Sequence, residues 1–325
     1  MITAKEVRLL MNQAGRCALP FLFGIDYEME RGFFIPHPLE QQAVLWRVSA
    51  HTNIPKALTK SPLLGSHFTS HPVDYATYSQ RFSYVQQQLL QGNSFLTNLT
   101  LKTPITTDYT LQEILLHSQS PYGVALPNRF VCFSPETFVR IKGTTIYSNP
   151  MKGTIRCDVP HAEQVILADY KEQAEHNTIV DFIRSDLSRV ATQIKVDRFR
   201  YIDRVETSNG AILQVSSQIS GELPADYTAC LGDILFTLLP AGSISGAPKV
   251  STCKIIAAAE QEKRGYYSGV FGYYDGIELD SAVMIRYLEQ VNDSFYFRSG
   301  GGITINSTMR SEYEEMLEKV YLPFV

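Results

Sequence analysis

The sequence has few cysteines, and their spacing forms no pattern. Its 325 residues include five cysteines, an odd number, and no two of them stand at C-x-x-C spacing. A disulfide framework needs paired cysteines, and a structural zinc site needs closely spaced cysteine or histidine ligands. We therefore expect buried, reduced thiols, which are typical of a cytosolic protein.

The sequence also lacks long apolar runs and an excess of positive charge. No run approaches the roughly 18 apolar residues of a membrane span, and the opening MITAKEVRLLMNQAG has no apolar signal-peptide core. There are 29 Lys and Arg against 33 Asp and Glu, a net charge of −4. Such a surface does not gather nucleic acid or an anionic membrane. We expect a cytoplasmic protein that binds neither, and that meets any anionic ligand with local donors.

Repeats, low-complexity tracts and a Gly/Pro-rich linker are absent as well. At roughly 100 to 200 residues per domain the chain has room for two domains, but no linker separates them. Helical spacing marks 74–92, 171–194 and a helix that ends at Gly265, whereas 129–154 and 269–303 resemble consecutive strands, the second an antiparallel meander. The pattern predicts an α+β protein with much antiparallel sheet.

Two pairs of carboxylates recur at one spacing on predicted helices, Glu172 with Glu175 and Glu312 with Glu315. Residues three apart share a helix face, so each pair can present oxygens to one point. Clustered carboxylates suit a hard divalent ion such as Mg²⁺. Acids at this spacing are also common on a solvated helix face, and we expect His176 beside them to lie on the helix surface.

Two glycine-rich segments could bring backbone N–H groups close to an anion: Ala241 to Ala247, before a helix, and Ser299 to Gly302, after a strand. Neither matches a nucleotide-binding signature, and by themselves such segments are more often simple turn glycines. Lys152, in the tight NPMKGT segment, is either a solvated lysine or, in a partly buried pocket, a nucleophile or base.

Taken in chain order, several segments resemble those of the chorismate-utilising enzymes: anthranilate synthase large subunits, aminodeoxychorismate synthase component I, and isochorismate and salicylate synthases. They are SPETF, NPMKGT, KEQAEHNTIVDFIRSDLSRV, PAGSISGAPK, RGYYSGVFGYYDG, MIRYLEQ and GGGITINSTMRSEYEE. The resemblance runs from about residue 75 to the C-terminus. It implies the family's α+β sandwich of antiparallel sheets with surrounding helices, as in anthranilate synthase component I. It also implies one body over 1–325, with a catalytic core at 75–325 and a short segment at 1–74 packed on it. We expect Trp46 in the core.

The resemblance also assigns residues to the site. It implies that both acidic pairs hold Mg²⁺, which neutralises the C1 carboxylate of chorismate. The backbone cradle for the substrate and the residues that bind the enolpyruvyl carboxylate would come from the glycine-rich segments and two later strands. The implied metal ligands are Glu172, Glu175, Glu312 and Glu315, and the implied substrate-binding residues are Gly242, Ser243, Gly300, Gly301, Gly302, Thr154, Arg286 and Tyr273.

Lys152 separates the branches of the family. The anthranilate branch usually has alanine there, whereas a lysine resembles the aminodeoxychorismate synthases, in which it is a covalent nucleophile. Glu136 matches the family's general acid. The implied reaction converts chorismate and ammonia to 4-amino-4-deoxychorismate for para-aminobenzoate and folate biosynthesis. The sequence contains no amidotransferase region, so a separate glutamine amidotransferase subunit would supply the ammonia.

Two positions depart from the family pattern and leave alternatives open. Gln214 stands where the family usually has histidine, and Leu96 where isochorismate-type enzymes have a water-activating lysine and amino-transferring ones commonly have glutamine. Lys152 and Gln214 count against anthranilate synthase component I, and Leu96 counts against an isochorismate or salicylate synthase. A catalytically silent homologue that only binds chorismate or the amidotransferase is a further alternative.

Overall fold

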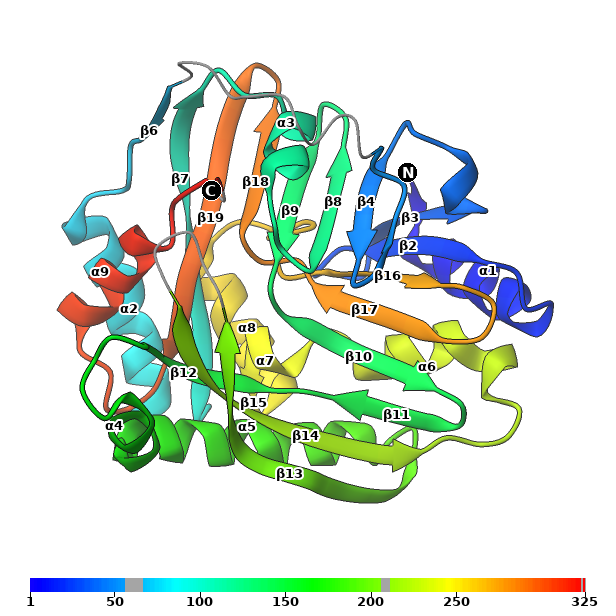
Figure 1. Cartoon of the computed structure of the whole chain (residues 1–325). Helices are drawn as coiled ribbons and strands as arrows, with labels where there is room; N and C mark the ends of the chain where they lie inside the picture. The colour runs from blue at the N-terminus through cyan, green and yellow to red at the C-terminus, as the bar shows by residue number, and fades with distance from the viewer. Residues whose placement is uncertain (56–66, 206–210, 323, 325) are drawn as a thin grey trace.

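The computed structural model describes residues 1–55, 67–205, 211–322 and 324, and two antiparallel sheets make up its framework. Figure 1 shows the strands of one sheet upright and those of the other running across the view. In the described part of the chain, the larger sheet has the order β1-β3-β2-β16-β17-β10-β11-β14-β12, with β13 on β14. The smaller has the order β15-β7-β19-β18-β9-β8-β4-β5, with β6 on β7. The α+β class with antiparallel sheets is confirmed.

The strands of the larger sheet are β1 (Ile2–Thr3), β2 (Phe21–Ile25), β3 (Arg31–Pro36), β10 (Thr137–Lys142), β11 (Thr145–Ser148), β12 (Met151–Arg156), β13 (Thr192–Val205), β14 (Ile212–Glu222), β16 (Val270–Tyr274) and β17 (Leu279–Val283). Those of the smaller sheet are β4 (Leu45–Val48), β5 (His51–Thr52), β6 (Phe68–Ser70), β7 (Leu96–Thr107), β8 (Tyr122–Leu126), β9 (Phe130–Ser134), β15 (Gly246–Ala247), β18 (Tyr287–Val291) and β19 (Ser294–Ile303). Strands from the first 74 residues thus enter both sheets.

The helices are α1 (Ala4–Arg16), α2 (Tyr75–Leu90), α3 (Leu111–His117), α4 (Ala162–Ala168), α5 (Tyr170–Leu187), α6 (Leu231–Leu238), α7 (Gly242–Ser245), α8 (Lys249–Glu260) and α9 (Met309–Glu318), with the 3₁₀ turns η1 (Pro38–Glu40) and η3 (Tyr227–Cys230).

Helix boundaries follow local signals where a cap is present. The Asp74 side chain accepts a hydrogen bond from the Thr77 N–H at 2.8 Å and begins α2 where the sequence predicts it. Two predicted ends are wrong. The apolar stripe of α5 stops at Leu187, because Thr192 already belongs to β13. Helix α8 stops at Glu260, short of Gly265, because Gln261 takes the left-handed conformation (φ 57°).

The predicted meander over 269–303 is two hairpins in different sheets. Strands β16 and β17 pair in the larger sheet, whereas β18 and β19 pair in the smaller one. The chain crosses between the sheets at Arg286, whose φ is 52°. It makes a similar crossing between β9 and β10, at Ser134-Pro135-Glu136. Two predicted site residues, Glu136 and Arg286, therefore lie at corners between the sheets.

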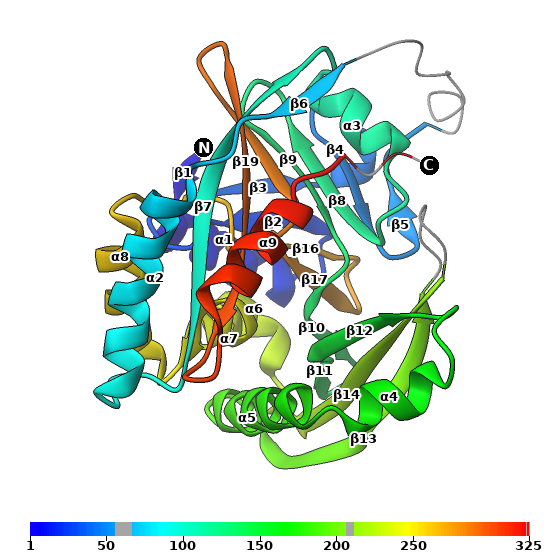
Figure 2. The same cartoon turned by 90° about the vertical axis from the view of Figure 1, so that its left-hand side faces the viewer.

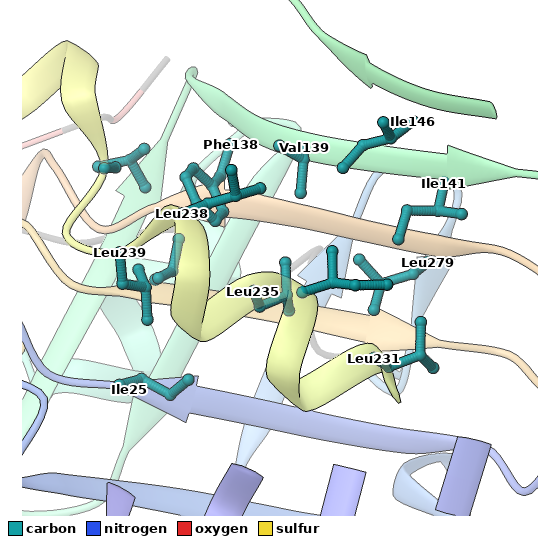
Figure 3. Packing of buried hydrophobic residues seen from close by; sticks show 14 of the residues in the cluster. Ile25, Phe138, Val139, Ile141, Ile146, Leu231, Leu235, Leu238, Leu239 and Leu279 are labelled. Carbon is teal, nitrogen blue, oxygen red and sulfur yellow. The ribbon is translucent and has the colours of Figure 1, made fainter. Parts of the chain in front are cut away.

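Helices cover the outer faces, and aromatic residues fill the space between the sheets. In Figure 3 leucines of α6 pack on Val139 and Ile141 of β10 and on Leu279 of β17. Helices α2 and α8 pack against β7 beside α9 (Figure 2). Trp46 is fully buried between the sheets, which confirms the predicted core position. All five cysteines are free, as expected, but only Cys132 is buried and Cys17 is exposed, so the prediction of buried thiols is wrong for most of them.

One stretch, Tyr227–Ser245, is long and apolar enough to cross a membrane by length and composition. It consists of η3, α6 and α7, and Leu239-Pro240 lies between α6 and α7. Of its hydrophobic window, 61% is buried inside the protein. Core helices of soluble proteins pass the same test. The leucines of α6 pack against the larger sheet, so this stretch is a core element of the fold.

Candidate active site

Glu136 begins the site at the corner before β10. Its N–H donates to the Ser134 hydroxyl at 3.1 Å, and the Ser243 hydroxyl donates a short hydrogen bond to its Oε1. Burial raises the pKa of Glu136 above the usual 4.5, although Ser243 and the charges of Lys152, Arg286 and Lys319 act to lower it. Such a carboxyl keeps its proton to higher pH than an exposed glutamate, which suits a general acid.

Helix α7 holds Gly242 and Ser243 against the other side of Glu136. A Cβ on Gly242 would lie 1.9 Å from the ring of Phe182 on α5, so only glycine allows this approach. Gly246, which ends the helix, has a φ of 127°, and a Cβ there would lie 1.8 Å from the Leu96 carbonyl oxygen. Close packing therefore requires glycine at both positions. The interpretation of this segment as simple turn glycines did not include that requirement.

Lys152 on β12 reaches toward three other elements. Its Nζ lies 3.8 Å from Glu175 Oε2 of α5, and its side chain is only 22% exposed. The same Nζ is 3.5 Å from the position that a Cβ on Gly302 would take. It also lies close enough to Glu136 for its charge to lower the pKa of that carboxyl. The structure thus gives Lys152 the partly buried setting that the sequence left open.

The two acidic pairs face the site from different helices. On α9, Glu312 and Glu315 each place a carboxylate oxygen 3.3 Å from the position of a Cβ on Gly301. On α5, Glu175 faces Lys152, and a Glu172 oxygen lies 3.1 Å from a Cβ position on Gly153. Within the described residues, no three His, Cys, Asp or Glu side chains gather closely enough to hold a metal as they stand. The pairs supply hard oxygen donors of the type that Mg²⁺ prefers, above glycines that leave room for a ligand.

Arg286 lies near this group, whereas Tyr273 and Thr154 do not join it. Arg286 donates from Nε to the Tyr321 hydroxyl at 3.1 Å. Tyr273 packs its ring 4.7 Å from that of Trp46 and lines a cleft of about 760 Å³ together with Pro135 and Thr137.

Glu136, Lys152 and Arg286 do not line this cleft, so Tyr273 borders a different cavity from the one at Glu136. The predicted grouping of Tyr273 with Arg286 is therefore not seen in this structure. Thr154 is exposed, and its backbone pairs with Gln214.

Two residues of the site region were not predicted. Lys319 of α9 donates to the Gly300 carbonyl at 2.8 Å and to Glu315 at 2.6 Å, and burial lowers its pKa. Its position one helical turn after Glu315 was a usable signal. Tyr267, in the turn before β16, is buried, packs near Tyr287 and lies under the guanidinium of Arg298, and its sequence context gave no sign of this.

His176 is buried, so its predicted surface position is wrong. Its exposed fraction is 1%, and Nε2 is 2.7 Å from the Ser217 hydroxyl. Burial, with the nearby charges of Arg200 and Lys152, lowers its pKa to about 4, so the ring is neutral near pH 7. His176 precedes Ile179 and Val180 by one turn, and this spacing places it on the buried stripe of α5.

Leu96, one of the two departures from the family pattern, lines this region. Leu96 is buried, and its Cδ1 lies 3.0 Å from a Cβ position on Gly302, beside Lys152. With Phe95, Tyr170 and Glu175 it lines a cavity of about 380 Å³. An aliphatic side chain therefore occupies the position next to Lys152 at which the family resemblance predicts a polar group.

Comparisons with known proteins show the family of the chain. The family model described as chorismate binding enzyme matches residues 24–323, a longer stretch than the predicted start near residue 75. The chain is 50% identical over 313 residues to a protein of Haemophilus influenzae named Uncharacterized PabA-like protein, covering 96% of this chain and 94% of that one. It is 30% identical to aminodeoxychorismate synthase component 1 of Bacillus subtilis, over 75% of this chain and 54% of that protein.

A solved structure extends the likeness to the whole fold. The menaquinone-specific isochorismate synthase MenF of Escherichia coli superposes with a TM-score of 0.75 at 18% identity, covering 98% of this chain and 81% of that one. At this identity the likeness concerns the fold, including strands from the first 74 residues. With the family match over nearly the full length, the chain belongs to the chorismate-binding enzymes and acts on chorismate.

Proposed function

We propose that this enzyme is an aminodeoxychorismate synthase component I, which converts chorismate and ammonia to 4-amino-4-deoxychorismate. The observation that carries the proposal is the position of Lys152, whose Nζ lies beside Gly302 and Glu175 and whose charge reaches the half-buried Glu136. A lysine and a carboxylic acid in one partly buried site are the nucleophile and the general acid that this reaction needs. The Bacillus subtilis relative of that name supports the same assignment.

In the proposed mechanism, the Lys152 amine forms a bond to C2 of chorismate. As both conjugated ring double bonds shift toward C4, the C4 hydroxyl leaves as water with the proton of Glu136. Ammonia then bonds to C4, the two double bonds return to their original positions, and the C2–N bond to Lys152 breaks. Glu136 recovers its proton from the added ammonia, so the net change is hydroxyl for amine.

The surrounding residues bind and orient the dianionic substrate. The guanidinium of Arg286 and the N–H groups around Gly242 and Gly300 to Gly302 would hold its carboxylates. We propose that Glu172, Glu175, Glu312 and Glu315 hold Mg²⁺, which supplies charge neutralisation for a substrate carboxylate. The ammonia would come from a separate glutamine amidotransferase subunit.

A product assay tests the proposal directly. The protein is incubated with chorismate, Mg²⁺ and ammonium, with and without an aminodeoxychorismate lyase. We expect para-aminobenzoate only when the lyase is present, and loss of turnover when the metal is chelated. Fluorescent anthranilate together with pyruvate would instead indicate an anthranilate synthase, and turnover without ammonia an isochorismate or salicylate synthase.

The nucleophile is tested by Lys152→Ala, with Lys142→Ala as the matched control because the Lys142 side chain is 72% exposed and lies on β10. We expect Lys152→Ala to lower aminodeoxychorismate formation by on the order of 10²-fold or more, while Lys142→Ala keeps it. Denatured wild-type enzyme quenched during turnover should carry a chorismate-derived mass on Lys152. Full activity of Lys152→Ala would remove the nucleophile from the mechanism.

A further inference from the structure

A buried ion pair, Arg264 with Glu260, connects the two glycine-rich segments of the site. Both side chains are at most 1% exposed, and their contacts are 2.6 Å and 3.0 Å. Arg264 lies just after α8, and Glu260 is the last residue of that helix. Neither residue belongs to the predicted site or takes part in the proposed mechanism.

The Arg264 guanidinium reaches both segments. Its Nη1 donates to the Ile244 carbonyl of α7 at 2.9 Å, and its Nη2 donates to the Asn98 carbonyl of β7 at 2.9 Å. Ile244 follows Ser243, whose hydroxyl donates to Glu136. Asn98 pairs across the smaller sheet with Gly302, which lies beside Lys152. One planar cation thus fixes the distance between the helix that touches the acid and the strand pair that borders the lysine.

Glu260 is also hydrogen-bonded to β7, the strand that contains Asn98. Its Oε1 accepts from both the N–H and the hydroxyl of Thr100, each at 2.9 Å. Thr100 pairs with Gly300, at the other end of the glycine run. A charged pair taken out of water is costly unless its hydrogen bonds are well made, and these bonds go to α7 and β7, beside the two glycine-rich segments.

We propose that Arg264 and Glu260 are positioning residues that hold α7 and the Gly300 to Gly302 segment at the separation needed for chorismate turnover. The inference deepens the proposed function and rests on it for the identity of the reacting groups. The pair acts through Ser243 and Gly302 and touches no reacting atom itself.

Arg298 provides a matched control. It is equally buried, at 1%, and its Nη1 lies 3.8 Å from Glu260. Arg298 donates to the Lys263 carbonyl at 2.7 Å and lies 3.2 Å from Glu262, and neither partner belongs to α7 or to β7. Arg298→Lys therefore perturbs the same charge cluster without removing a bond to either site segment.

The first measurement is hydrogen exchange in the intact protein. Lysine retains the charge of Arg264 but cannot donate at once to Glu260, Ile244 and Asn98. We expect Arg264→Lys to speed exchange of peptides over 241–247 and 299–302 by about tenfold or more relative to wild type, whereas Arg298→Lys leaves them near the wild-type rate. Equal exchange in the two variants overturns the proposal.

The second measurement is chorismate consumption, which does not depend on the product. For Arg264→Lys we expect kcat to fall on the order of 10²-fold with a smaller change in KM, as for a displaced acid. The alkaline limb of the pH profile of kcat should move to higher pH, as in Ser243→Ala. In both variants Glu136 loses the hydrogen bond from Ser243, which lowers the pKa of its carboxyl. The charged groups facing Glu136 are Lys152, Arg286 and Lys319, with Asp186 lining the same small cavity, and both variants retain all of them.

Equal loss of kcat in Arg264→Lys and Arg298→Lys, with no shift of the pH profile, would assign the pair to stability alone and overturn the proposal. If Arg264→Lys does not fold, Glu260→Asp is compared with Arg298→Lys by the same criteria. Failure of both to fold, while Arg298→Lys folds, also overturns it.

The wild-type enzyme separates this proposal from the proposed function. If wild type consumes chorismate without forming aminodeoxychorismate, the proposed function is overturned but this test remains valid. If wild type consumes no chorismate, the hydrogen-exchange rates alone decide between the outcomes.

Discussion

Glu136 is the residue in which stability and chemistry oppose each other. Burial raises its pKa, so the ionised form is penalised in the folded protein relative to the unfolded chain. The stability that its protonated form provides is fully present below about 4.5, the ordinary value, and is lost as pH rises through the higher folded pKa. The position of Glu136 therefore lowers stability at high pH but preserves the proton that a general acid donates.

Glu136→Gln should therefore lower kcat for chorismate by on the order of 10²- to 10⁴-fold while raising the melting temperature at pH 8. At pH 4, where the wild-type carboxyl is protonated in both states, the difference in melting temperature should vanish. Calorimetry at the two pH values and a turnover assay check this. Glu278→Gln, on the face of the larger sheet that borders the 760 Å³ cleft, should leave turnover unchanged. An active Glu136→Gln would contradict the role of general acid.

His176 gives the protein a second pH-dependent residue, with the opposite sign. Its pKa is depressed from 6.5 to about 4 by burial, then by Arg200 and Lys152. Its contribution to stability is present above pH 6.5 and is lost as pH falls toward 4, because the unfolded chain takes up the proton first. The shift corresponds to about 3 kcal/mol.

We expect the free energy of unfolding of wild type to fall by up to about 3 kcal/mol more than that of His176→Gln between pH 7 and pH 4. Urea titrations at several pH values measure the difference. His67→Gln, at an exposed position, serves as the control and should keep the wild-type slope. Equal slopes for wild type and His176→Gln would show that the ring is not protected from protonation.

Among the elements, α7 depends most on close packing. It is only four residues long, and Gly242 lets it approach Phe182 of α5 while Arg264 holds its Ile244 carbonyl. A helix this short gains little from its own hydrogen bonds. Its position against Glu136 therefore comes from neighbours distant in sequence.

Gly242→Ala should destabilise the protein by about 1 to 3 kcal/mol and lower turnover, because the added methyl group collides with the Phe182 ring. Adding Phe182→Leu should recover part of both losses. Denaturant unfolding and chorismate consumption provide the two readouts. Gly143→Ala is the control: its φ is 57° with open space around it, so only backbone strain of about 1 kcal/mol applies, without loss of turnover. No rescue by Phe182→Leu would show that another contact sets the position of α7.

At the scale of the whole molecule, the two sheets meet through a shared aromatic core. Trp46, the sole tryptophan of the sequence, is fully buried there and packs on Tyr273 of the opposite sheet. Strands from the first 74 residues belong to both sheets. A chain built in this way should unfold as one unit, as the prediction of a single body over 1–325 requires.

The emission of Trp46 should be that of a buried indole and should shift to longer wavelength in one transition on unfolding. This transition should coincide with the loss of far-UV circular dichroism. Acrylamide quenching of the native protein, which should be weak, provides an independent check. Separate transitions for fluorescence and circular dichroism would contradict the single-body prediction.

The sequence predicted much of the fold through local signals. Asp74 marked the start of α2, and turn residues marked the strands between 129 and 154. Prediction from the sequence failed where contacts between residues far apart in the chain determine the structure. Local sequence does not show that β16 and β18 belong to different sheets, or that α8 ends at a left-handed Gln261. The same limit applied to Tyr273, whose orientation depends on Trp46 across the sheets.

The sequence by itself determined the family, the α+β class and the residue types available for chemistry. Its net negative charge also required that an anionic substrate be bound by local donors. Only the tertiary structure decided which of those residues meet. It brought Lys152 near Glu175 and Gly302, buried His176, left Thr154 exposed, and placed Arg264 between α7 and β7. The reason is physical: these contacts join residues far apart in the chain, so they exist only once both sheets have formed and excluded water.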